Sequence, residues 1–195
     1  MTESTDASPA VETVREFVLA GHGNFDKVRQ MLVERPALLN MAFAWRPNDL
    51  ETALQAAAHM GNRPIAEYLL SAGSPQDICT AAMLGRQAEV ERLLIADPDL
   101  AQAVGAHGIG LLAHAALSGE VELVRRLVAH GAQGSMGQAL NNAVIKQHAA
   151  MVAWLLDNGQ PDLAWTDFQG KTALQNATDN GTPEIAALIQ SDIAR

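Results

Sequence analysis

Histidine is the residue type in this sequence with the clearest potential for chemistry, because imidazole can bind a metal ion or transfer a proton. His107 lies in a glycine-rich turn, His114 follows on the next predicted helix, and His59 ends an earlier one. Three imidazoles near one surface could bind a metal. Their spacing matches no metal motif, however, and the sequence identifies no carboxylate that would orient them. We therefore predict no metal site and no cofactor, and interpret His114 as a hydrogen-bonded structural residue.

Patterns typical of enzymes are absent from the sequence, which has no nucleophile motif, phosphate loop or dinucleotide fingerprint. Residues 105–110 (GAHGIG) invite comparison with a phosphate loop, but they lack the Lys-Ser/Thr ending and the preceding strand, so a turn explains their glycines better. Glu51 could act as an acid or base only if it were paired. We expect it instead at a helix N-terminus, where a carboxylate meets the positive end of the dipole. The prediction is a protein that is not an enzyme.

The composition is that of a globular protein of 195 residues, with 48% hydrophobic and 18% charged residues. A net charge of −9 disfavours binding to nucleic acid or to an anionic membrane. The single cysteine, Cys79, excludes an internal disulfide and indicates a reducing compartment. The sequence has no apolar run of membrane-spanning length and no signal pattern at its start. We therefore expect a cytoplasmic protein with a flexible tail over residues 1–10.

The elements that must position these side chains form a repeated pattern. At six places an Ala-rich or apolar segment is followed by a glycine or, once, by Gln147: Gly23, Gly61, Gly85, Gly119, Gln147 and Gly181. Eight residues after each of these lies an apolar residue: Met31, Leu69, Leu93, Leu127, Leu155 and Ile189. The pattern predicts pairs of short helices joined at the glycine. Because one pair cannot bury its own apolar face, the pairs must stack.

The spacing of the copies predicts where loops project from the stack. The intervals between the six positions alternate between long and short, and the short ones leave no room for a hairpin. Pro36, Pro98 and Pro161 recur at nearly equal intervals, and proline ends a helix and starts an extended segment. We predict three tandem two-repeat units, with projecting hairpins or loops, termed fingers, only near 38–51, 98–110 and 160–172.

Two segments, 52–57 (TALQAA) and 172–177 (TALQNA), resemble the Thr-Pro-Leu-His-x-Ala motif of ankyrin repeats, and 167–172 (DFQGKT) resembles the ankyrin finger turn. The chain is also similar to a bacterial subgroup of ankyrin proteins, through motifs that include 21–24 (GHGN) and 81–85 (AAMLG). The resemblance implies an all-α, ankyrin-type α-solenoid in a single domain over 11–195. Its six helix-pair repeats would lie at about 11–40, 50–74, 75–98, 108–133, 136–160 and 170–195.

The same resemblance implies a concave groove formed by the first helices and the fingers. Its apolar centre would contain Met60, Met83, Leu84 and Leu117, with His59 beside them. Methionine adapts to irregular partners, and an apolar centre with polar ends is typical of an interface. The alternative is that these side chains simply pack between repeats.

Aromatic residues on the predicted fingers give a second set of partner contacts. Trp45 lies on the first finger, His107 on the second, and Trp165 and Phe168 on the third. Tryptophan is enriched among residues that dominate binding energy. The alternative is that each ring folds back over its own finger or the neighbouring helix.

We therefore predict a monomeric, non-enzymatic adaptor that binds an unknown protein partner through its groove and fingers. A second hypothesis is a small-molecule or metal pocket, possibly enzymatic, which would be built from His59, Met60, Met83, His107 and His114. A third is an immunity or regulatory protein for a genetically linked partner, to which the acidic charge would steer it.

Overall fold

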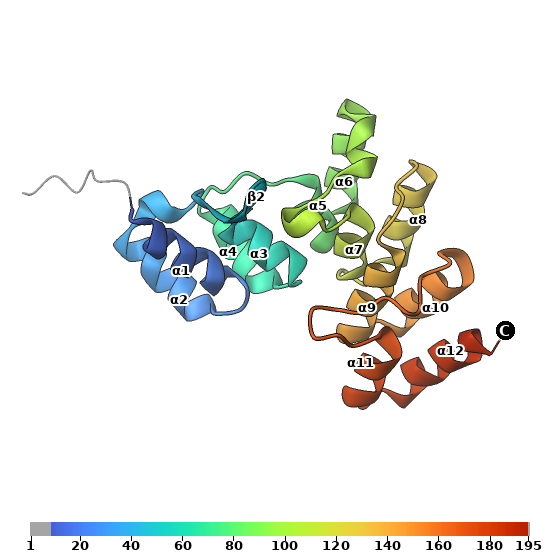
Figure 1. Cartoon of the computed structure of the whole chain (residues 1–195). Helices are drawn as coiled ribbons and strands as arrows, with labels where there is room; N and C mark the ends of the chain where they lie inside the picture. The colour runs from blue at the N-terminus through green and yellow to red at the C-terminus, as the bar shows by residue number, and fades with distance from the viewer. Residues whose placement is uncertain (1–8, 195) are drawn as a thin grey trace, which may run out of the picture. The chain divides into compact units, whose positions relative to one another are not determined.

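The computed structural model describes residues 9–194, so the expected tail over 1–10 lies outside the described residues except for Pro9 and Ala10. The described chain is mostly helical (Figure 1). Its helices are α1 Val11–Gly21, α2 Phe25–Glu34, α3 Ala53–His59, α4 Arg63–Ser71, α5 Ile78–Met83, α6 Gln87–Ala96, α7 Leu111–Ala116, α8 Val121–Ala129, α9 Met136–Ile145, α10 Ala149–Asn158, α11 Ala173–Asp179 and α12 Pro183–Ile193. None of these helices is long and apolar enough to cross a membrane.

Contacts divide the chain into two compact units. The first contains the chain up to Gln76 together with Ala106–Gly108, and the second contains Asp77–Gly105 and the chain from Ile109 onward. The prediction of one domain over 11–195 stays a prediction.

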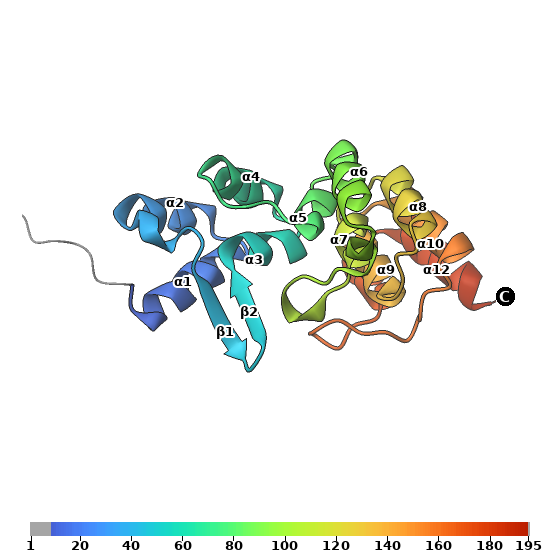
Figure 2. The same cartoon turned by 90° about the horizontal axis from the view of Figure 1, so that it is seen from above.

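The first unit consists of two helix pairs and a β-hairpin. Helix α1 packs on α3, and α2 packs on α4. Strands β1 (Ala42–Arg46) and β2 (Asp49–Thr52) pair in antiparallel register, with Phe43 opposite Glu51 (Figure 2). Strand β2 leads directly into α3, because Thr52 and Gln55 form a capping box at the start of the helix. The hairpin is therefore fixed to the first helices at its base.

The second unit consists of four helix pairs. The first helices of the pairs, α5, α7, α9 and α11, pack on one another in order, and α8, α10 and α12 do the same (Figure 1). The core combines large side chains such as Leu112, Leu127 and Leu155 with small ones such as Ala82 and Ala116. The small residues let the backbones of neighbouring helices approach closely, as the repeat pattern predicts.

The fingers lie where the sequence predicts them, at alternate repeats. The first is the β1–β2 hairpin. The second and third are loops, closed by the single bridges Val104↔Gly110 and Thr166↔Thr172. The structure thus confirms an all-α ankyrin-type architecture of six helix pairs, to which the first finger adds a small two-stranded sheet.

Candidate functional site

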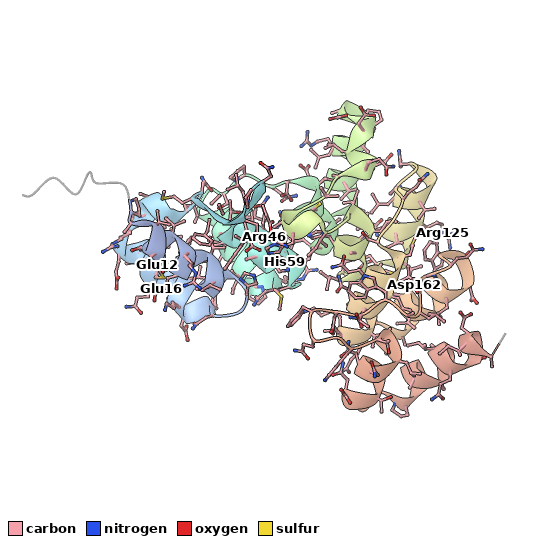
Figure 3. All side chains as sticks on the ribbon, viewed as in Figure 1. Glu12, Glu16, Arg46, His59, Arg125 and Asp162 are labelled. Carbon is pink, nitrogen blue, oxygen red and sulfur yellow. The ribbon has the colours of Figure 1, made fainter. Side chains whose placement is uncertain are left out.

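Three histidines and one glutamate meet in the first unit. His22, Glu51, His59 and His107 each offer one ligand atom, and these four atoms all lie within 4.8 Å of one another. The centre of the cluster is Oε1 of Glu51. It lies 2.7 Å from Nε2 of His59, 3.3 Å from Nε2 of His107 and 3.6 Å from Nε2 of His22. Figure 3 labels His59 at the end of α3. We call these four residues the histidine cluster.

The ends of two helices and one strand bring three members of the cluster together. His22 is the C-cap residue of α1, His59 is the last residue of α3, and Glu51 lies on β2 just before α3. A close approach of α1 to α3 is possible because residue 21 is glycine: a Cβ there would lie 2.6 Å from the carbonyl oxygen of Ala53. The end of α1 therefore reaches the start of α3, where Glu51 lies.

The fourth member, His107, comes from the short 3-10 segment η3 (Ala106–Gly108). Its backbone is in the left-handed region, with φ at 59°. Asp49 of β2 holds this conformation, because its carboxylate accepts from the backbone N–H of His107 at 3.1 Å and faces the ring Nδ1 at 3.0 Å. The hydrogen bond from the His107 ring, followed by those from its backbone and from Arg46, outweighs burial and holds the pKa of Asp49 below its ordinary value. An ionised carboxylate only accepts, so His107 carries its proton on Nδ1.

The central carboxylate is fully buried and ionised. Burial raises the pKa of Glu51, but the hydrogen bond from His59, the charges of His22 and His59, and the Trp45 N–H together outweigh it and hold that pKa below its ordinary value. Trp45 Nε1 donates to the second oxygen, Oε2, at 2.6 Å. Glu51 lies at the N-terminus of α3, directly before the N-cap residue Thr52, as expected. Its carboxylate also contacts His59 and accepts a hydrogen bond from Trp45, two partners that were not expected.

Trp45 lies inside this arrangement rather than projecting from the finger. Its ring contacts Phe43 edge-on at a centroid distance of 4.9 Å and His22 at 6.4 Å. The ring thus folds back over its own finger, which is the alternative considered for it. Contact with a partner through its remaining exposed face stays a proposal.

Of the residues in the hypothesis of a pocket, His59 and His107 meet in the first unit, whereas Met83 and His114 belong to the second unit. There the His114 ring faces the Gly110 carbonyl oxygen at 3.0 Å and is buried, as predicted for a structural histidine. A cavity of about 640 Å³ in the first unit is lined by residues of α1, α2 and η1 (Pro36–Leu38), and none of the cluster side chains lines it.

The predicted groove residues divide by burial. Met60 is exposed, next to His59, whereas Met83, Leu84 and Leu117 are buried. Their burial favours the alternative considered above, that these side chains pack within the protein interior. Contact of these three residues with a partner stays a prediction.

The two aromatic residues of the third finger, Trp165 and Phe168, also differ in how much of their surface is exposed. Trp165 packs over Gly137 of α9, where an added Cβ would lie 2.7 Å from the Trp165 Cβ. Phe168, in contrast, is 88% exposed. It follows Asp167, whose carboxylate accepts from the backbone N–H groups of Gln169 and Lys171 and from the side chain of Asn176. These hydrogen bonds fix the backbone of the turn, and the Phe168 ring at its tip is exposed to solvent.

Sequence reasoning did not include His22, Asp49 and Glu51 among the site residues. A signal for His22 existed, because the repeat register places the ends of neighbouring first helices side by side, and thereby places His22 near His59. Glu51 precedes the second of these helices directly. No comparable signal existed for the contact of His107 with Asp49, which depends on the path of a loop.

Comparison with known families agrees with the architecture. A model described as ankyrin repeats in three copies matches residues 78–164 and 112–194, and a single ankyrin repeat matches residues 49–81. The search of curated proteins finds no significant match.

Proposed function

Because the chain belongs to the ankyrin repeat family, whose repeats are generally modules for protein–protein interaction, we propose that it is a non-enzymatic adaptor that binds a protein partner. The proposed contacts are the third finger and the exposed ends of the first helices. In this proposal the protein works as a monomer in the cytoplasm.

The observation that carries this proposal is the exposure of Phe168. Phe168 is 88% exposed, so most of its large apolar surface is in contact with water in the free protein. The hydrogen bonds of Asp167 to both sides of the turn fix the backbone that presents it. Asn176 links the same carboxylate to Asn141 of α9, so the finger is tied to the body of the second unit. A ring presented in this way loses little conformational freedom when a partner covers it.

Other residues extend the proposed surface. Trp165 lies three positions before Phe168 on the same finger and is partly exposed. In the first unit, Met60 is exposed at the end of α3, beside His59, and Trp45 and His107 keep part of their surface open. The net charge of −9 favours a basic partner, because opposite charges accelerate encounter. A genetically linked partner, regulated or neutralised by this chain, is one form that such a partner would take.

The test is affinity capture from the source cells with three baits: wild type, Phe168→Ala and Ile95→Ala. Ile95 is a matched control, because it is also a large, exposed apolar residue of the second unit, on α6 away from the finger. The proposal expects one stoichiometric protein that is captured by wild type and Ile95→Ala and lost with Phe168→Ala. Equal capture by all three baits would contradict the assignment of the finger. Capture of no protein by wild type would contradict the adaptor function.

A further inference from the structure

We propose that the first unit binds one zinc ion, held by Nε2 of His22, His59 and His107 and by Oε1 of Glu51. The proposal does not rest on the adaptor function, because its argument uses none of the residues of the third finger, although His59 and His107 also belong to the proposed partner surface. It rests on four ligand atoms, from four separate segments of the chain, that all lie within 4.8 Å of one another.

The distances from Glu51 Oε1 to His107 and to His22 are close to those of a tetrahedral site, whereas the distance to His59 is that of a hydrogen bond. Zinc bonds to histidine nitrogen and carboxylate oxygen are about 2.0–2.2 Å long, so neighbouring ligand atoms in a tetrahedron lie about 3.3–3.5 Å apart. The separations from Glu51 Oε1 to the three Nε2 atoms are 2.7, 3.3 and 3.6 Å. Small side-chain rotations would therefore be sufficient to place an ion between them.

Hydrogen bonds behind the ligands orient two of the imidazoles. Nδ1 of His22 lies 3.1 Å from the Val18 carbonyl oxygen, and Nδ1 of His107 lies 3.0 Å from the Asp49 carboxylate. Both of these oxygens only accept, so both rings carry a proton on Nδ1 and direct Nε2 at the cluster. Histidines that bind metals typically donate their second N–H to a carbonyl or carboxylate in this way.

A hydrogen bond also orients the Glu51 carboxylate. Trp45 donates to Oε2 of Glu51 and leaves Oε1 directed at the histidines. Nε2 of His22 and Nε2 of His107 both face this anionic oxygen, and each nitrogen presents a lone pair to a cation once it carries no proton. The rings of His22 and His59 are only 5.0 Å apart, and those of His59 and His107 are 5.3 Å apart. A divalent ion would satisfy all four groups at once.

The set of ligands favours a transition metal, and in particular zinc. Imidazole suits zinc, copper, iron and nickel, whereas calcium and magnesium prefer sites made of oxygen. Glu51 is fully buried, His59 is nearly so, and the His22 and His107 side chains are each 27% exposed. Four protein ligands that leave no position open for substrate are typical of a structural zinc site, not of a catalytic one. The ion would fix the hairpin and η3 to the ends of α1 and α3.

The experiment uses the untagged full chain, treated with a chelator and then titrated with zinc chloride by calorimetry. We expect one zinc per chain, and a melting temperature higher by roughly 5–10 °C when free zinc is about 100 times the Kd. His22→Ala and His107→Ala should weaken binding by more than about a hundredfold. His130→Ala is the matched control, because His130 is a partly exposed histidine of the second unit, and it should bind as wild type does.

Two further measurements keep the test decisive if an alanine variant fails to fold by circular dichroism. Asp49→Asn keeps all four ligands and should weaken zinc binding about 10–100-fold, because it changes the acceptor that orients His107. Cobalt bound to the wild-type chain should show the intense visible absorption of a tetrahedral site. Absence of zinc binding to wild type, absence of that absorption, or unchanged affinity in every folded cluster variant would overturn the proposal.

Discussion

Oε1 of Glu51 lies 2.7 Å from Nε2 of His59, although one residue is on strand β2 and the other ends helix α3. The capping box at Thr52 joins the strand to the helix between them. The contact therefore ties the base of the hairpin to the far end of α3. Glu51 is fully buried and also accepts a hydrogen bond from Trp45. Replacing its carboxylate with a neutral group would therefore weaken both of these contacts.

We expect Glu51→Gln to lower the free energy of unfolding of the metal-free protein by about 1–3 kcal/mol, because the substitution removes charge-assisted hydrogen bonds from a buried group. Urea unfolding in the presence of a chelator measures this difference. Glu16→Gln is the control, since Glu16 pairs with Lys27 on the exposed surface and should contribute at most about 1 kcal/mol. Equal effects of the two substitutions would show that the Glu51 contacts contribute little.

Two glycines, Gly21 at the end of α1 and Gly23 in the turn after it, test the close approach of α1 to α3. Gly21→Ala should destabilise the protein by about 1–3 kcal/mol, because the new Cβ would meet the Ala53 carbonyl oxygen at 2.6 Å. Gly23→Ala, two residues later, should have little effect, since its Cβ would meet no atom within 4 Å. Melting temperatures of the two variants provide the comparison. A Gly21→Ala variant as stable as Gly23→Ala would mean that α1 does not approach α3 so closely.

These contacts show which parts of the molecule the sequence could predict. The recurrence of Gly85 and Gly119 and of Leu127 and Leu155 follows from helix geometry and the need to bury an apolar face, so the helix pairs and the alternating fingers could be predicted. The burial of Met83 could not be predicted, because an apolar residue at this position of the repeat is compatible either with an exposed groove or with the protein interior.

The proximity of His22 to His59 could be predicted from the repeat register, but the complete histidine cluster could not. It depends on the left-handed backbone of His107 and on the contact of His107 with Asp49, two residues from different fingers. The spacing of residues within one segment of the sequence does not indicate a contact between two separate fingers. The position of Trp45 likewise depends on its hydrogen bond to Glu51, which no residue pattern within the finger indicates.

The contribution of the third finger to the free energy of unfolding should depend on pH, because Asp167 titrates. Burial raises the pKa of this carboxyl group, but hydrogen bonds from Asn176, Lys171 and Gln169 outweigh it, so the folded pKa lies below the unfolded value. Its contribution to stability is therefore present above the unfolded pKa of about 3.9 and is lost as pH falls through the folded pKa. Urea unfolding of wild type and Asp167→Asn should differ at pH 6 and converge in acid. A difference that grows on acidification would contradict this assignment.

Cys79 should react slowly in the folded protein. Burial, together with the nearby Asp77 charge, raises the pKa of the thiol to about 12, so little thiolate is present at neutral pH. A colorimetric disulfide reagent should label the thiol slowly in native protein and rapidly in denaturant. Rapid labelling of the native chain would show that α5 opens readily.

The most direct test of the histidine cluster is crystallographic. Crystals grown with zinc should be measured on both sides of the zinc absorption edge, and the anomalous difference map inspected in the first unit. We predict one strong peak about 2.0–2.2 Å from Glu51 Oε1 and from Nε2 of His22, His59 and His107. A map with no peak between these four side chains, from crystals grown in an excess of zinc over protein, would contradict the proposal of a zinc site.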